Sequence, residues 1–158
     1  MDFPIKNLVI RIPRIVSLSF QRFVQADLKR ESDFYSAENF NISFADNNVY
    51  VSETKSRYSA SSNFYLKLAA RLSIFLASLE QKEMRYPRFI FSDNMEDKGM
   101  EIGRTQNMQR IIIKKLSEYN PDDYQIIFAT SMIADEFDTP EYVVGEKYTE
   151  DNKSLKNV

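Results

Sequence analysis

Three carboxylates follow a short apolar run in the middle of the chain. Asp93, Glu96 and Asp97 come directly after Phe89 to Ser92, and a segment with helical character runs from Glu101 to Tyr119. This order of strand, loop and helix is that of an α/β unit. Open α/β sheets bind ligands at the carboxyl ends of their strands, so the acids lie where a nucleotide-hydrolysing protein holds a metal. The same acids would also fit a solvated loop that caps the next helix, because the helix macrodipole favours them there.

Hydroxyl groups gather before one expected helix and after one expected strand. The sequence Ser59-Ala60-Ser61-Ser62-Asn63 opens a segment, Ser61 to Gln81, whose apolar residues recur at helical spacing. Helix N-termini bind phosphate well, so this start is a candidate phosphate site, and a serine-rich cap without a ligand is the alternative. Thr130 and Ser131 end a second expected strand, which covers Tyr124 to Ala129.

The composition excludes several kinds of chemistry. The 158 residues include no cysteine and no histidine, which removes thiol nucleophiles, disulfides, imidazole bases and ordinary zinc sites and leaves oxygen ligands of the kind that suit Mg²⁺. The 21 basic and 23 acidic side chains give a net charge of −2, so there is no global electrostatic footprint for nucleic acid or for an anionic membrane. Lys67, Arg71, Arg85 and Arg88 could form a local phosphate-binding patch or a solvated surface, and nucleic-acid binding is left open.

The N-terminal part of the chain combines a helix with a hairpin. From Ile15 to Tyr35, apolar residues that include Phe20 and Phe23 recur at helical spacing and predict an amphipathic helix. Its apolar face would pack on the chain's own core, or would form the root of a coiled coil or a contact with another subunit. Two expected strands, Asn41 to Phe44 and Val49 to Ser52, flank a turn rich in Asp and Asn.

The length fits a single domain. A last short strand is expected around Tyr142 to Val144, followed by a polar tail over residues 149–158. No apolar run approaches the roughly 18 residues of a membrane span, and the N-terminus lacks the layout of a signal peptide. We therefore expect a cytoplasmic protein that does not enter a membrane.

Taken in order, these segments resemble the C-terminal half of an ABC-type ATPase head of the SMC and double-strand-break-repair class, as found in AAA-like ATPases of bacterial defence systems. The resemblance extends from about Phe40 to the C-terminus. Within it, Ser59 to Asn63 lies where the family has its signature motif, and Phe89 to Asp93 resembles the Walker B strand. Asp97 to Met100 falls in the region of the D-loop, and Gln125 to Ser131 is similar to the strand that ends in the family's switch residue.

This resemblance implies a fold and a set of roles. The fold would be α/β, the C-terminal lobe of a P-loop NTPase of the ABC ATPase head type, with an N-terminal helix and a β-hairpin. Residues 1–36 would form a helical segment at the root of a coiled coil, 37–148 the lobe, and 149–158 the tail. Asp93 would hold Mg²⁺, and the catalytic positions would be Glu96, Asn94 and Ser131. ATP would be contacted by Ser59, Ser61, Ser62, Asn63 and Thr130.

The chain also departs from the family pattern at functional positions. Asn94 stands directly after the Walker B aspartate, where the family has a catalytic glutamate, and an amide cannot take a proton from water. Glu96 is the nearest replacement. Ser131 stands where the family has a histidine, and Ala60 and Ser61 replace the two glycines that let the signature backbone approach phosphate.

The largest departure is the missing phosphate-binding loop. No G-x-x-x-x-G-K-[ST] occurs, and the only glycines are Gly99, Gly103 and Gly145. Mg²⁺ and ATP are thus expected only in an assembly with a P-loop-containing half or a homologous head, and we expect an oligomer with an uncovered sheet face or edge in the isolated chain. The alternative is a catalytically inactive ATPase-like interaction or regulatory protein, and a fragment, a split subunit and a degenerate remnant all fit the sequence.

Overall fold

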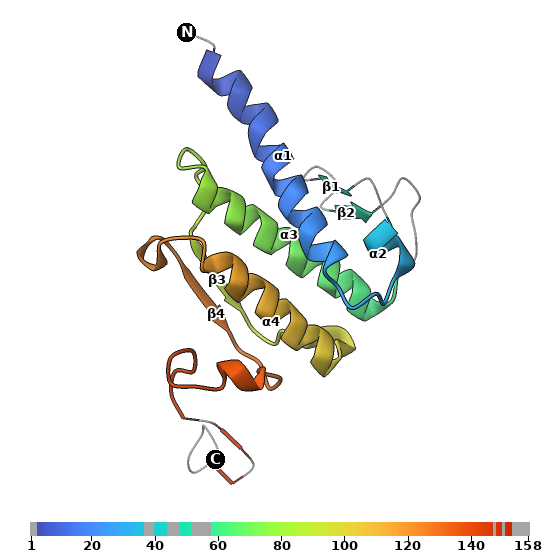
Figure 1. The fold of residues 1–158 in the computed structure, drawn as a ribbon, viewed down its shortest axis with the longest axis vertical. Helices are drawn as coiled ribbons and strands as arrows, with labels where there is room; N and C mark the ends of the chain where they lie inside the picture. The colour runs from blue at the N-terminus through green and yellow to red at the C-terminus, as the bar shows by residue number, and fades with distance from the viewer. Residues whose placement is uncertain are drawn as a thin grey trace.

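A computed structural model describes residues 11–36, 40–43, 48–51, 58–146, 148–149 and 151–152, together with the helical backbone of residues 3–10. Over this part the chain is a mixed α/β structure with four α-helices and two two-stranded sheets (Figure 1). The elements in chain order are α1 (Phe3–Gln25), α2 (Ser32–Ser36), β1 (Phe40–Ser43), β2 (Asn48–Val51), α3 (Ala60–Glu80), β3 (Phe89–Ser92), the 3₁₀ turn η1 (Asp97–Gly99), α4 (Ile102–Leu116), the 3₁₀ turn η2 (Pro121–Asp123), β4 (Gln125–Phe128) and the 3₁₀ turn η3 (Asp135–Phe137).

The first helix differs from its expected bounds at both ends. It begins at Phe3 and ends at Gln25, and a separate short helix, α2, covers the end of the segment expected to be continuous. The segment between the two helices contains Lys29, which has a left-handed conformation with φ of 55°. The predicted apolar stripe is confirmed at Phe20 and Phe23, which are fully buried, but not at Leu28, which lies beyond the helix and is 47% exposed.

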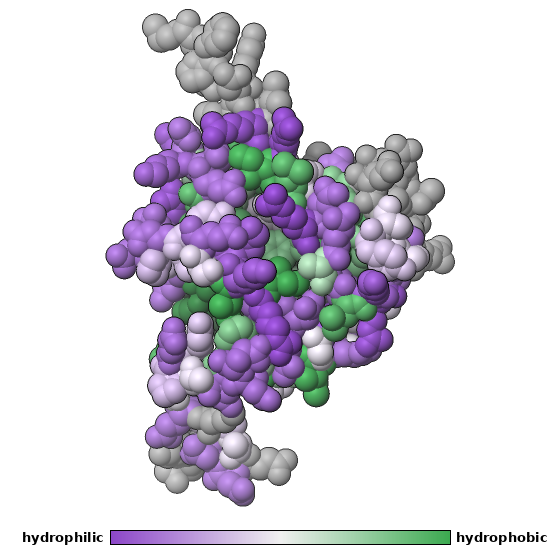
Figure 2. Space-filling model, in the orientation of Figure 1, coloured by the Kyte–Doolittle hydropathy of each residue, from purple (hydrophilic) through white to green (hydrophobic). Residues whose placement is uncertain are grey.

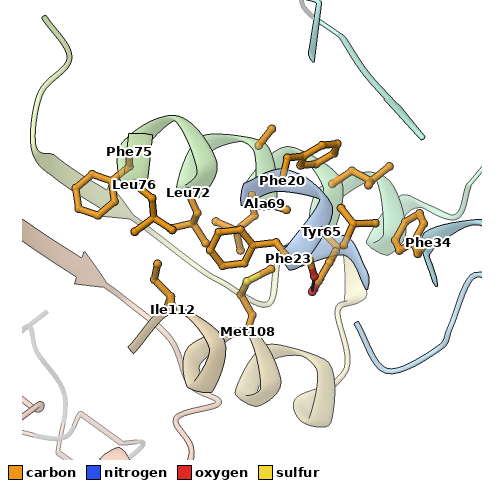
Figure 3. Close-up of a cluster of buried hydrophobic side chains, with 14 of the residues drawn as sticks. Phe20, Phe23, Phe34, Tyr65, Ala69, Leu72, Phe75, Leu76, Met108 and Ile112 are labelled. Carbon is orange, nitrogen blue, oxygen red and sulfur yellow. Dashed lines mark hydrogen bonds between the residues drawn. The ribbon is translucent and has the colours of Figure 1, made fainter. Parts of the chain in front are cut away.

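The third helix is the centre of the core. α3 is buried on most sides and carries the fully buried Tyr65, Leu72 and Phe75. Figure 3 shows α1 side chains on one side of it and the α4 side chains Met108 and Ile112 on another. Each such side chain stabilises the fold by roughly 1.5–3 kcal/mol relative to an exposed position, so α3 fixes the positions of α1 and α4.

The two central strands form a parallel pair. Phe89 pairs with Gln125 and Phe91 with Ile127, and α4 makes the crossover between β3 and β4. Ile90 points to the core, whereas Phe89, Phe91 and Ile127 are 47%, 53% and 41% exposed. The expected strands are confirmed, and so is the expected apolar sheet surface.

The N-terminal hairpin is also confirmed over the described residues. β1 and β2 are antiparallel, with Phe40 opposite Val51 and Ile42 opposite Val49. The turn expected between them covers residues 45–48. Residues 45–47 lie outside the described residues, and Asn48 begins β2.

One expected strand is wrong. The chain around Tyr142 forms a turn, in which the amides of Tyr142 and Val143 both donate to the carbonyl of Thr139. Tyr-Val-Val has strand propensity, but it needs a neighbouring strand to pair with, and none lies beside it in the described part. Most of the predicted polar tail, residue 150 and residues 153–158, lies outside the described residues. Along the described chain, no helix has the length and apolar character that crossing a membrane requires.

Candidate functional site

Glu96 lies at the centre of a small polar cluster beyond the carboxyl ends of β3 and β4. Its Oε1 accepts hydrogen bonds from the Ser131 amide at 2.8 Å and the Ser131 hydroxyl at 2.6 Å. Its Oε2 accepts one from the Thr130 hydroxyl at 2.7 Å. The carboxyl ends of parallel strands lie at the same edge of a sheet, and the two loops therefore meet. The structure thus brings together Glu96, Thr130 and Ser131, three of the residues that the sequence singled out.

The cluster holds Glu96 in its ionised form. Partial burial alone would raise the pKa of the Glu96 carboxyl, but the hydrogen bonds from Ser131 and Thr130 outweigh burial and lower the pKa below its ordinary value. An anion held by three donors is well positioned but is a weak base. In this arrangement Glu96 can orient a neighbouring group more readily than it can accept a proton.

Asp93 and Asn94 flank the cluster on the β3 side. Both are exposed, and Asn94 has a left-handed φ of 55°, which asparagine tolerates better than most residues. This turn lets the amide of Met95 donate to the carbonyl of Ala129 at 3.3 Å, continuing the contact between the two strands. Asn94 therefore shapes the loop, and the Asp93 carboxylate stands at the end of β3.

A glutamine that the sequence did not single out fixes the loop after β4. The buried Gln109 of α4 donates from Nε2 to the carbonyl of Met132 and accepts from the amide of Ala134. Gln106, one helical turn earlier, donates to the carbonyl of Ile133. These contacts hold the backbone that carries Ser131. In the sequence, these contacts are marked only by two glutamines on one face of a helix. That pattern is too common to predict them.

The serine-rich start of α3 forms a second group. Ser59 is the N-cap, and its hydroxyl accepts from the amide of Ser62 at 3.2 Å, as predicted for a cap. Asn63 donates to the carbonyl of Tyr58, and the Ser62 hydroxyl is buried against Arg104. Ser59 is exposed and Ser61 is half-buried, so these two present the most accessible hydroxyls.

Arg104 is the second residue that sequence reasoning missed. It lies at 3% exposure and donates to both oxygens of the buried Asp27, at 2.9 and 2.5 Å, and to the Ser62 hydroxyl at 3.1 Å. Its guanidinium also lies 4.6 Å from the centre of the Tyr65 ring. Burial and the Asp27 charge raise the pKa of the Tyr65 hydroxyl, while Arg104 acts in the opposite direction. This network joins the end of α1 to the starts of α3 and α4.

A shallow polar pocket opens beside this network. Its volume is about 210 Å³, and its described lining is Arg30, Glu31, Ser59, Ser61, Ser62, Glu101 and Arg104. Two of these lining residues, Arg30 and Glu101, form an ion pair with each other. The lining includes neither Asp93 nor Glu96, so over the described residues the α3 start and the Glu96 cluster are separate groups.

The donors fit part of a Mg²⁺–nucleotide site. Mg²⁺ in nucleotide sites is usually held by one or two carboxylates and the phosphates, and Asp93 could be one of these. Among the described residues no group of three acidic side chains gathers around a common point, and the sequence has no loop to cradle phosphate. The described residues alone therefore do not form a complete Mg²⁺–nucleotide site.

The chain matches no protein-family model, no curated protein and no solved structure. Its function is inferred from its own geometry.

Proposed function

We propose that this chain is the C-terminal half of an SMC-like ABC ATPase head, which completes an ATP-hydrolysing site together with a P-loop-containing half. The observation that carries the proposal is the exposed apolar face of a parallel sheet. Parallel sheets occur almost only with both faces covered, yet here Phe89, Phe91 and Ile127 are open to solvent on one face of a pair of only two strands.

The visible surface agrees with a body that lacks a covering layer. Figure 2 shows apolar patches within a mainly hydrophilic surface, one of them over the region of β3 and β4. Both strands are four residues long, and each has an outer edge that pairs with no further strand among the described residues. Further strands and helices from another lobe would pair with these edges and bury the face.

The element order supports the same proposal. A capped helix, a strand ending in Asp93, a short turn, a helix, and a parallel strand ending in Thr130 and Ser131 follow one another as in that family's C-terminal lobe. ATP held on the other half would bring its Mg²⁺, which neutralises charge on the phosphates. Asp93 would bind that ion, Glu96 would orient the attacking water, and Thr130 and Ser131 would hold Glu96 in place.

The α3 start would serve a second nucleotide. Ser59 and Ser61, with the backbone amides of the first helical turn, would face phosphate bound by a homologous head. Ser62 and Asn63 would support that turn from below, because their side chains already bond to Arg104 and Tyr58. The sequence predicted that all four residues contact ATP, whereas in this proposal only Ser59 and Ser61 do so with their side chains.

A second candidate function is a catalytically inactive interaction protein with the same architecture. The observation that favours it is the occupied Glu96 carboxylate, whose two oxygens already accept three hydrogen bonds. Asn94, directly after Asp93, carries an amide that cannot act as a base. Such a protein would pair with an intact ATPase through the exposed sheet face and regulate it.

Reconstitution separates the two candidates. The chain would be co-expressed with a candidate P-loop-containing ATPase half, and ATP hydrolysis by the purified complex would be compared with that of each half alone. Hydrolysis by the complex only, abolished by Asp93→Asn, is the expected result. A stable complex without hydrolysis would support the regulatory protein and contradict the enzyme.

A further inference from the structure

A groove lies between the hairpin and α3, and its described lining includes no residue of the Glu96 cluster. It has a volume of about 310 Å³. Its described lining is Ile42, Ser43, Asn48, Val49, Asn63, Leu66, Lys67, Ala70, Arg71 and Ile74. Of the residues proposed for the ATPase site, Asn63 alone is in this described lining, and its side chain is bonded to the carbonyl of Tyr58.

Two kinds of side chain line the groove. Leu66 and Ala70 form a buried apolar floor, whereas Lys67 and Arg71 are exposed. The two cations lie four residues apart on α3, and so on the same side of the helix. No carboxylate of the described residues lies within ion-pair distance of either. The groove therefore suits a ligand that is apolar along its length and negatively charged, which is the chemistry of an acidic peptide with apolar side chains.

A segment of that chemistry protrudes from the same chain. Between Ala134 and Glu146 the sequence carries five carboxylates and no basic residue. Within it, Glu141 and Glu146 flank the apolar stretch Tyr142 to Val144, in which Tyr142 is 45% and Val144 98% exposed. In Figure 1 this C-terminal arm projects from the body on the side away from the hairpin. The arm consequently lies far from the groove of its own chain.

The lengths of groove and segment agree. The lining runs along α3 from Asn63 to Ile74, which at 1.5 Å per residue is about 16 Å. An extended chain from Glu141 to Glu146 spans about 16 Å at 3.3 Å per residue. We propose that the groove between the β1–β2 hairpin and α3 binds residues 141–146, in the C-terminal arm of a second copy of this chain. The contact is head-to-tail, so it joins copies into chains or closed rings.

A peptide probe tests the contact apart from any other self-association. A fluorescent synthetic peptide of residues 134–146 is titrated with the full chain at low salt, and its anisotropy is measured. The wild-type chain is expected to bind it, and Lys67→Glu with Arg71→Glu is expected to weaken binding by about tenfold or more. The matched control is Lys82→Glu with Arg85→Glu, which changes the net charge equally at two exposed positions outside the groove.

A charge exchange tests the contact between whole chains. Sedimentation should show weaker association for the groove variant Lys67→Glu with Arg71→Glu, and likewise for the arm variant Glu141→Lys with Glu146→Lys. A mixture of these two variants should regain association, because intact grooves then meet intact arms. Circular dichroism confirms that each variant is folded.

Four results would overturn the proposal. These are no binding of the peptide, equal binding by the groove variant, equal binding of a peptide with the same composition in scrambled order, and no recovery in the mixed sample. If a single-stranded oligonucleotide displaced the peptide and bound more tightly in a manner dependent on Lys67 and Arg71, the groove would be a nucleic-acid site instead, and the arm would be rejected as its occupant.

Discussion

Glu96 and Ser131 are joined by two hydrogen bonds, one from the Ser131 amide at 2.8 Å and one from its hydroxyl at 2.6 Å. They belong to loops that follow two different strands, so this contact couples the end of β3 to the end of β4. A substitution at either residue is therefore expected to alter the loops that follow both strands.

The first prediction concerns hydrolysis in the complete assembly. Glu96→Gln removes the charge and keeps the shape, so ATP binding should be nearly unchanged while the steady-state rate falls by about a hundredfold or more, the scale expected when a positioned carboxylate is lost. Glu83→Gln at an exposed position is the matched control and should leave the rate unchanged. Wild-type hydrolysis by the Glu96 variant would show that this carboxylate has no part in catalysis.

The second prediction concerns acid stability of the isolated chain. The pKa of Glu96 is lowered in the folded state, so its stabilising contribution is present above the unfolded value near 4.5 and is lost as pH falls through the folded pKa. Glu96→Gln should reduce the free energy of unfolding at pH 7 by about 1 kcal/mol. The difference from wild type should shrink below pH 4.5, as measured by denaturant unfolding at several pH values. A difference that is constant with pH would mean that the ionised Glu96 carboxylate is not the source of this stabilisation.

The third prediction concerns the buried pair of Arg104 and Asp27. Arg104→Met leaves Asp27 as an uncompensated buried charge and should cost about 3–5 kcal/mol of unfolding free energy. Adding Asp27→Leu should recover most of that loss, because the charge is then removed. Arg110→Met breaks an exposed ion pair with Glu136 and should have little effect. Equal losses in the two single variants, measured by urea unfolding, would mean that burial of the Asp27 pair is unimportant.

The fourth prediction concerns the open sheet face. Phe91→Thr with Ile127→Thr keeps strand propensity and should change the unfolding free energy by less than about 1 kcal/mol, since both side chains are exposed. Binding of a P-loop half should weaken strongly. The buried neighbour Ile90→Thr is the contrasting variant and should cost about 2 kcal/mol or more. Unimpaired complex formation by the double variant, measured by sedimentation, would exclude this face as the interface.

The parts of the fold that were predictable have local signatures. The strand at Phe89 to Ser92, the long helix α3 and its Ser59 cap all follow from apolar spacing and capping chemistry within a few residues. The meeting of Glu96 with Ser131 also follows from the sequence once both strands are taken to be parallel, because their carboxyl ends then share an edge.

The parts that could not be predicted depend on distant contacts. Arg104 and Asp27 are 77 positions apart in the chain, and no local pattern marks either as buried. The end of α1 at Gln25 could not be predicted either. Directly after it, Asp27 contacts the distant Arg104, and Lys29 has a left-handed φ. The expected strand at Tyr142 failed for a related reason, since strand propensity is expressed only where a pairing edge is present.

The central claim is that this chain is one half of a two-part ATPase. Calorimetric titration with Mg-ATP tests this claim most directly. The isolated chain should show no binding in the micromolar range, because its three glycines build no phosphate-cradling loop. The complex with a P-loop half should bind Mg-ATP, and Asp93→Asn should weaken that binding. A low-micromolar dissociation constant for the isolated chain, or affinity in the complex unaltered by Asp93→Asn, would contradict the account.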